Sequence, residues 1–321
     1  MDKVDIGIFR EILDPRGQYP FQSDVRKSFR TLARRLDVDE ATVRSRLKKL
    51  HESGFIKDLR VVPIPSLLYL RLGICRFDVN PESMKEDTIR KLRLIQGVWL
   101  IHSYVGNSLR IHLFFEDDHS LKRQIELISR ISNSENILPA EIHFPRCEIA
   151  LSKADWSIIR SIHRDPMKSC NEVSNETGLS NKTVKRRLER MLGEKALVVL
   201  PSLELRSLRG AVLGELLIFY SNSESRKEVN EKLVPRLEEC FMSTQLGDPE
   251  HSLFVLLIDN ISRVREILDW VKQQKGVTAA YLDLVEERIE LCSFIDERLD
   301  KKLLRLQQSA SKIATLNQRS R

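Results

Sequence analysis

One short segment occurs twice in this chain. The segment at residues 42–47, TVRSRL, recurs 141 positions later (183 − 42 = 141) at residues 183–188 as TVKRRL. Self-similarity of this kind indicates a chain built by duplication, in which each copy is one structural unit. The repeat therefore predicts that the 321 residues form two equivalent halves rather than one large core.

Each copy of the segment falls in the last of three predicted helices. Apolar residues at helical spacing predict the helices at 4–13, 28–36 and 40–53 in the first copy, and at 151–163, 169–177 and 181–192 in the second. Asp39 is placed to act as the N-cap of the third helix. We expect a hairpin at 55–62 to follow the first copy and a shorter wing at 196–200 to follow the second. This order is typical of a winged helix-turn-helix.

A second kind of unit follows each winged unit. Alternating apolar residues predict strands at 67–79, 98–105, 109–116 and 140–149, and again at 211–220, 240–247, 252–258 and 277–285. Helical patterns separate them at 82–96, 119–132, 224–238 and 261–274. The resulting β-α-β-β-α-β order predicts a ferredoxin-like arrangement.

The predicted fold class is therefore α+β, with two winged helix-turn-helix units alternating with two ferredoxin-like units. Leucines and smaller apolar residues at alternating steps of four and three residues predict a packed helix at the C-terminal end. The expected boundaries are 1–62, 66–149, 150–204 and 209–293 for the four units, and 294–321 for the last helix.

Positive charge is concentrated on the two winged units. The chain carries a formal charge of +7, whereas residues 26–50 contain nine basic and three acidic side chains and residues 168–191 contain six and three. Clustered Lys and Arg favour a polyanionic partner because they release phosphate counterions on binding. This distribution indicates double-stranded DNA as the partner.

The candidate DNA-binding residues lie on the second and third helices. Early residues of the third helix enter the major groove, where Arg and Lys reach guanine and Thr and Ser contact phosphate or base edges, while the second helix crosses the backbone. The first copy supplies Arg30, Arg34, Arg35, Thr42, Arg44, Ser45, Arg46, Lys48 and Lys49. The second copy supplies Lys182, Thr183, Lys185, Arg186, Arg187 and Arg190, diluted by Glu176 and Glu189.

Several function classes are not favoured by the sequence. Five scattered cysteines without a CxxC pair predict a reducing compartment, and the lack of a signal peptide or a long apolar run predicts a cytoplasmic chain without a membrane partner. No nucleophile triad, P-loop or dinucleotide fingerprint is present, so we expect neither catalysis nor a cofactor.

The residues of both winged units resemble the Lrp/AsnC family of transcription regulators, which is usual in prokaryotes, including archaea. The resemblance covers nearly the whole chain twice. It rests on DKVDIGIF (residues 2–9), LARRL (32–36), RLKKL (46–50), SGFI (53–56), LSKADWSII (151–159) and GLS (178–180), followed by Thr183, Val184, Arg187 and Leu188.

The resemblance implies a ligand-sensing role for the ferredoxin-like units, with a small-molecule effector such as an amino acid. The family's effector loop, between the second and third strands, corresponds to Gly106 and Asn107 in the first copy and to Gly247 and Asp248 in the second. The loop of the first copy is shorter than that of the second and lacks the acidic residue. At both loops the alternative interpretation is a plain hairpin turn without an effector. The duplication implies a pseudo-dimer within one chain, alone or in a homodimer, that reads half-sites about 34 Å apart.

Two other functions remain open from the sequence. Winged helices also bind proteins, so a protein-interaction module is one alternative. Sirohaem decarboxylases resemble the same two-domain unit and are the other, since fold does not settle function. Their Tyr-Arg-Arg type of segment is missing from residues 101–105 (IHSYV) and 242–246 (MSTQL).

A pair of histidines suggests a metal site as a further hypothesis. If the hairpin at 98–116 turns about Asn107, His102 lies directly opposite His112, and both lie on the face away from the helices, the face on which His143 could also lie. Two imidazoles on facing strands can ligate zinc, but a third ligand is needed. The alternative is a histidine pair at a sheet-to-sheet interface, and we expect no metal.

Overall fold

The computed structural model describes residues 3–13, 29–144, 147–166, 168–237, 240–246, 250–291 and 293–319. The first winged unit contains α1 (Lys3–Leu13), α2 (Phe29–Leu36) and α3 (Glu40–Glu52). Asp39 caps α3 as predicted, since its carboxylate accepts a hydrogen bond from the Thr42 N–H at 2.7 Å.

The second winged unit repeats this arrangement with α6 (Lys153–Ile162), α7 (Cys170–Thr177) and α8 (Asn181–Gly193). A serine caps the N-terminus of each helix: Ser152, Ser169 and Ser180. The first two form capping boxes with an acidic residue three positions later, which satisfies two backbone N–H groups at once.

The prediction of separate wings was wrong. A single strand, β1 (Ile56–Pro63), follows the first unit, and it pairs antiparallel with β6 (Leu197–Leu203), which follows the second. Residues 55–62 contain no Gly, Pro or Asn that would turn the chain back on itself, so they continue as one strand, irregular between Ile56 and Asp58, that takes its partner from the other copy. This two-stranded ladder joins the two winged units.

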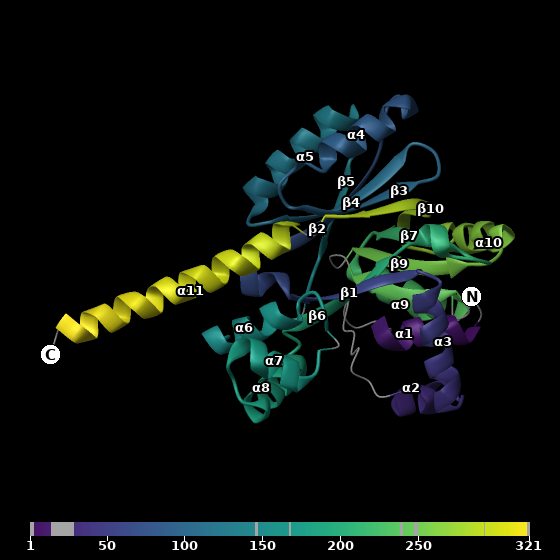
Figure 1. Ribbon diagram of the computed structural model, residues 1–321. Coiled ribbons are helices and arrows are strands. Elements are labelled where there is room, and N and C mark those ends of the chain that lie inside the picture. The colour runs from purple at the N-terminus through teal and green to yellow at the C-terminus, as the bar shows by residue number, and fades with distance from the viewer. Residues whose placement is uncertain are drawn as a thin grey trace.

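The first ferredoxin-like unit has the predicted order of elements. Its strands are β2 (Arg71–Asp78), β3 (Val98–Tyr104), β4 (Ser108–Phe115) and β5 (Leu138–Ile142), and its helices are α4 (Lys85–Leu92) and α5 (Asp118–Ser132). The strand order β5-β2-β4-β3 places the two long-range crossovers on one face, where α4 and α5 lie (Figure 1). Short 3₁₀ turns at Pro65–Leu68 and Glu82–Met84 precede β2 and α4.

The second ferredoxin-like unit repeats the topology. A 3₁₀ turn at Leu205–Ser207 leads into β7 (Val212–Tyr220), and the other strands are β8 (Phe241–Leu246), β9 (His251–Ile258) and β10 (Val277–Glu290). The helices are α9 (Ser223–Leu237) and α10 (Ile261–Lys272). The order β10-β7-β9-β8 matches that of the first unit.

Strand β10 joins the two sheets into one eight-stranded sheet. Residues 277–284 pair with β7, whereas residues 285–290 pair with β3 of the first unit. The 14-residue strand is therefore longer than the predicted 277–285, because its second half serves the other copy. The pseudo-dimer within the chain is thus held by shared hydrogen bonds at two places, β10 and the β1–β6 ladder.

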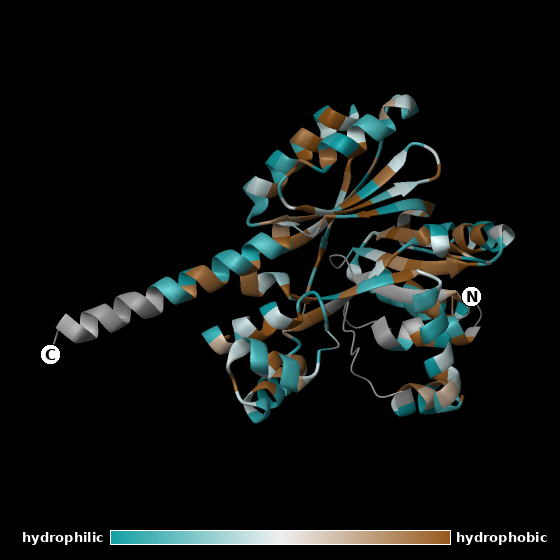
Figure 2. Ribbon diagram, in the orientation of Figure 1, coloured by the Kyte–Doolittle hydropathy of each residue, from teal (hydrophilic) through white to brown (hydrophobic). Residues whose placement is uncertain are grey.

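The helix-free faces of the sheets form the centre of the molecule. Leu100 and Phe114 of the first sheet share a buried cluster with Leu217 and Leu253 of the second. The hydropathy colouring shows apolar residues concentrated in the strands and polar ones on the helices of the winged units (Figure 2).

The last helix, α11 (Ser293–Arg319), begins against the first sheet and extends away from the body of the molecule (Figure 1). Leu299 is buried and Leu303 and Leu306 pack beside it, as the four-and-three spacing predicted. Side chains beyond residue 308 lie outside the described residues. The described helices include none whose length and hydropathy would suit a membrane span.

Candidate nucleic-acid interface

The third helices of the two winged units, α3 and α8, both lie on the side of the molecule where these units project (Figure 1). On α3 the apolar stripe is turned inward, with Val43 fully buried and Leu50 nearly so. Arg44, Ser45, Lys48 and Lys49 are exposed, and the side chain of Lys48 is 73% accessible. Arg44 and Lys48 each pair with an acidic residue four positions away on the same exposed face, and such exposed pairs cost little to break.

Two of the repeated residues have structural roles instead. Arg46 lies 3.5 Å from the Asp5 carboxylate of α1, and Arg187 lies 2.9 Å from the equivalent Asp155 of α6. The repeated threonines help to start the helices: Thr42 donates a hydrogen bond to Asp39, and the hydroxyl of Thr183 lies 2.9 Å from that of its N-cap, Ser180.

The Asp155 site is the stronger of the two ion-pair sites. Asp155 is fully buried, and Arg187 and Arg190 each donate to a different oxygen of its carboxylate at 2.9 Å. Burial opposes ionisation, but hydrogen bonds from Ser152 and Arg187 outweigh it and lower the pKa of Asp155. Arg187 and Arg190, predicted from the sequence to contact DNA, are therefore held against the core of their own unit.

Adjacent residues of α8 allow these roles to be separated. We expect Arg187→Ala to lower the free energy of unfolding by about 1–3 kcal/mol, because it removes a charged hydrogen bond to a buried carboxylate. Arg186→Ala, at an exposed position, should leave stability within about 0.5 kcal/mol and weaken DNA binding. Chemical denaturation and DNA titration of both variants check this, and equal stability of the two would contradict the structural role of Arg187.

The remaining predicted contacts are divided between the two units. On α2, Arg30 and Arg34 are exposed, whereas Arg35 pairs with Glu11 of α1 at 2.7 Å. On α8, Lys182, Lys185 and Arg186 are exposed, and Lys185 lies 4.0 Å from the carboxylate of Glu189. Each unit thus offers a basic outer face, and that of the first unit is larger.

Comparison with known proteins agrees with this geometry. A family model described as winged helix-turn-helix DNA-binding matches residues 1–57 and 151–194. The match covers both copies of the repeat and leaves out the ferredoxin-like units, so it identifies the winged helix-turn-helix units alone.

Relatives and solved structures extend the comparison beyond these units. The HTH-type transcriptional regulator Ptr1 of Methanocaldococcus jannaschii is 28% identical over 107 residues, which cover 33% of this chain and 66% of that protein. The chain thus spans just under two thirds of the length of this relative. The structure of E. coli AsnC is 18% identical and covers 47% of this chain and 97% of that one, with a TM-score of 0.32.

A likeness over the full length comes from an enzyme. The crystal structure of the siroheme decarboxylase NirDL is 14% identical to this chain, with a TM-score of 0.53. It covers 96% of this chain and 100% of that one. At this identity the likeness shows the fold alone, so the duplicated arrangement of four units is one that other proteins also adopt.

The predicted effector turns are only partly described. Gly106 takes a left-handed backbone conformation with φ +87°, and nothing lies within 4 Å of where a Cβ would stand. Gly106 is exposed and Asn107 half-buried at the tip of the β3–β4 hairpin. Gly247 and Asp248 lie outside the described residues. The turn at Gly106 is therefore explained by hairpin geometry, and an effector role for these residues stays a prediction.

The predicted alignment of the histidines was wrong by one step of the hairpin. His102 pairs with Arg110, and His112 pairs with Leu100, because the hairpin turns about Gly106 rather than Asn107. The rings of His102 and His112 are still neighbours, with centroids 5.9 Å apart, but His143 is exposed and lies beside Glu141. Within the described residues no group of three His, Cys, Asp or Glu side chains could hold a metal ion.

The histidines belong instead to a buried polar cluster between the sheets, which sequence reasoning missed. Glu215 of β7 is 1% exposed and accepts hydrogen bonds from Arg110 and from the Tyr104 hydroxyl, while His102 Nδ1 lies 2.9 Å from its carboxylate. Both ring nitrogens of His112 are buried with no hydrogen-bond partner among the described residues. The sequence did carry a signal for this cluster: a charged residue stands within each of two apolar strands, Glu215 in VLGELLIFY and Arg110 in SLRIHLFF.

Burial and charge together set the protonation of this buried polar cluster. Burial opposes ionisation of Glu215, but Arg110, His102 and the Tyr104 hydroxyl together outweigh it and lower the pKa to about 2. Burial lowers the pKa of His102 to about 4, although Glu215 opposes this shift. Burial, reinforced by Arg110, also holds the pKa of His112 well below its usual range. At neutral pH the cluster thus holds a charged Arg110–Glu215 pair and two uncharged histidines.

Proposed function

We propose that this chain is a DNA-binding transcription regulator of Lrp/AsnC type. The observation that carries the proposal is the recurrence of an exposed basic face on the third helix of both winged helix-turn-helix units, α3 and α8. The inward residues of these helices are fixed by packing, whereas the outward ones are exposed and include three that pair with a carboxylate of the same helix on its exposed face. The name of the relative, a transcriptional regulator, and the alternation of winged and ferredoxin-like units support the same conclusion.

The mechanism follows from these positions. Arg44, Lys48 and Lys49 of α3, and Lys185 and Arg186 of α8, would enter the major groove, where Arg and Lys recognise guanine O6 and N7. Exposed arginines of α2 would neutralise phosphates and set the register without reading sequence. The β1–β6 ladder would fix the distance between the two helices, so that one chain reads two half-sites.

A pair of matched triple variants tests the proposal. Arg44→Ala/Lys48→Ala/Lys49→Ala is expected to weaken binding to genomic DNA fragments about 100-fold, because each lost phosphate or base contact contributes about 1–3 kcal/mol. The slope of log affinity against log salt should fall by about 2–3. Fluorescence anisotropy titrations at several salt concentrations measure both quantities.

The control variant removes the same charge from another surface. Arg90→Ala/Arg93→Ala/Lys122→Ala changes three exposed basic residues of the first ferredoxin-like unit and should bind DNA like the wild type. Equal loss of binding in both variants would show a general charge effect rather than docking by α3. Absence of binding by the wild-type chain would leave the protein-interaction alternative.

The enzyme alternative has only the fold likeness to the decarboxylase in its favour. On the helix-free face of the first sheet, the Arg110–Glu215 pair occupies the interior with side chains that bind each other. A haem-like absorption band from the purified protein would be the observation that favours the enzyme.

A further inference from the structure

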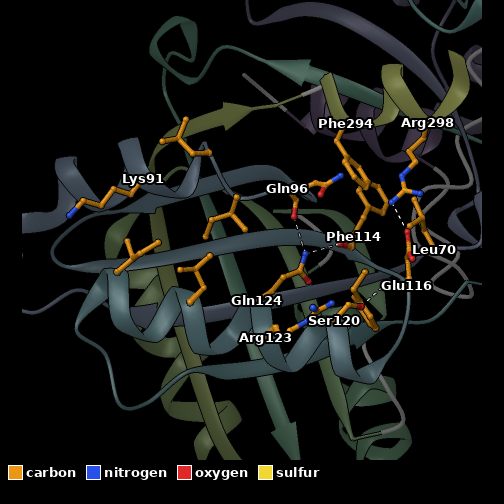
Figure 3. A pocket seen from close by; sticks show the side chains of 15 residues that line it. Leu70, Lys91, Gln96, Phe114, Glu116, Ser120, Arg123, Gln124, Phe294 and Arg298 are labelled. Atoms are coloured by element: carbon orange, nitrogen blue, oxygen red, sulfur yellow. Dashed lines mark hydrogen bonds and ion pairs between the residues drawn. The ribbon is translucent and has the colours of Figure 1, made fainter. Parts of the chain in front are cut away.

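A groove with a volume of about 700 Å³ runs along the outer surface of the first ferredoxin-like unit (Figure 3). It is bounded by α5, by the segment that joins α4 to β3, and by the start of α11. Leu94 and Leu127 line it and are unusually exposed for leucines, at 85% and 44%. The volume is within the range of sites for small organic ligands.

Aromatic rings and positive charge mark one end of the groove. Phe114 and Phe294 stack at 5.8 Å, and Arg298 lies over the Phe294 ring while it pairs with Glu116 at 2.6 Å. Arg123 also lines the groove, and no hydrogen bond or ion pair holds it within the described residues. Lys91 also lines the groove but pairs with Asp87 at 2.6 Å, as Arg298 pairs with Glu116. Arg123 is therefore the cation that favours an anionic ligand, and the rings favour one with a flat apolar body.

Gln124 adds an unused acceptor. Its Nε2 donates to the carbonyl oxygens of Gln96 and Phe114, at 2.9 and 3.2 Å, which fixes the orientation of the amide (Figure 3). The other side-chain atom, Oε1, is buried and accepts no hydrogen bond from any described residue. A ligand that supplies an N–H or O–H there would satisfy an acceptor that is costly to leave unpaired.

The groove is connected to the second winged helix-turn-helix unit through α11. Two residues after Phe294, Asp296 accepts hydrogen bonds from His163 at 2.6 Å and from Arg164 at 2.5 Å, and both partners follow the end of α6. Asp300 accepts from Arg160 of α6 at 2.7 Å. The same His163 ring contacts the carbonyl oxygen of Val61 in β1, so one turn of α11 contacts the second unit directly and reaches the ladder that joins the units through His163.

We propose that this groove binds aryl carboxylates that also carry a hydrogen-bond donor, and that α11 transmits their binding to the second winged helix-turn-helix unit. The carboxylate pairs with Arg123, the ring lies against Phe114 and Phe294, and the donor reaches Gln124 Oε1. Binding itself stands independently of the DNA-binding function proposed above, whereas the transmission rests on it.

Three related probes test the site on the full-length protein. Indole-3-acetate has the ring, the charge and the N–H donor, naphthalene-1-acetate lacks the donor, and indole-3-acetamide lacks the charge. Calorimetric titration should show saturable binding of indole-3-acetate, with each of the other two weaker by about tenfold. Arg123→Gln should weaken indole-3-acetate by a similar factor, and Lys122→Gln, at an exposed position of α5 that does not line the groove, should leave it unchanged.

Contrary outcomes would overturn the site. These are no saturable binding of indole-3-acetate, equal affinity for all three probes, or the same affinity in the Arg123→Gln variant. If light scattering shows that the wild-type protein self-associates and Leu94→Glu makes it monomeric, the groove is a contact between copies and the ligand site is wrong.

A second measurement tests the transmission. Saturating indole-3-acetate should change the DNA affinity of the wild-type protein at least about fivefold, and Asp300→Asn should reduce that change while it leaves probe binding intact. Unchanged DNA affinity with normal probe binding would overturn the transmission and keep the site. Absence of DNA binding under all conditions would instead be a failure of the proposed function.

Discussion

The Glu215→Gln variant is expected to lose about 3–5 kcal/mol of unfolding free energy, the largest effect of any single substitution considered for this chain. Glu215 and Arg110 are each about 1% exposed, and no other carboxylate forms an ion pair with Arg110 in the described part of the chain. Removal of the negative charge would leave a buried guanidinium uncompensated, which is far more costly than loss of the pair as a whole.

A double variant provides the control for this expectation. Arg110→Met/Glu215→Leu replaces both charges with apolar groups of similar size and should recover most of the stability lost in Glu215→Gln. Guanidinium denaturation of the three proteins measures the differences. If Glu215→Gln unfolds at the same denaturant concentration as the wild type, the buried pair is not a main stabilising contact between the sheets.

Acid is expected to destabilise the protein in two separate pH ranges. The pKa of His102 is lowered to about 4 from a usual 6.5, so the folded state binds this proton more weakly than the unfolded state. Its contribution to stability is therefore complete above pH 6.5 and is lost as the pH falls towards 4, by about 3 kcal/mol. His112 acts in the same direction. The contribution of Glu215 is lost only lower, as the pH falls from 4.5 towards 2.

The His112→Phe variant isolates part of this dependence. It replaces a buried imidazole without a hydrogen-bond partner by an apolar ring that can keep the edge-on contact with Trp99. We expect the variant to be at least as stable as the wild type at pH 7 and to lose less stability between pH 6.5 and 4. Thermal unfolding across this range checks the expectation, with His143→Gln at an exposed site as the control. A slope identical to the wild type would contradict it.

Most helices and strands could be predicted because their signals are local. Helical spacing of apolar residues, an N-cap such as Asp39 and short apolar runs in the strands are read within a few residues. The pairing of β1 with β6 and the division of β10 between two sheets were not predicted. The first joins residues more than 130 positions apart, and the second divides one strand between two partner strands. No local pattern encodes the choice of partner strand.

The candidate site followed the same division. Two of the predicted basic residues, Arg44 and Lys48, are exposed on α3, as the helical pattern indicated. In the sequence, Arg35 and Arg187 could not be distinguished from these exposed basic residues, but in the structure each pairs with a carboxylate on a preceding helix. The Arg110–Glu215 pair was missed because its members lie 105 residues apart and meet only when the sheets pack.

The repeated segment shows what each level determined. The sequence alone established the duplication, the helix that carries the segment and the buried stripe of Val43 and Leu47, because period and hydropathy are properties of the chain. Only the tertiary structure decided that the four identical positions are all structural, as a capping threonine, two packed apolar residues and an arginine paired with the first helix. The outward basic face lies at the positions that differ between the copies. The sequence could not separate the paired arginine from the exposed basic residues, because that difference arises only from contacts between helices.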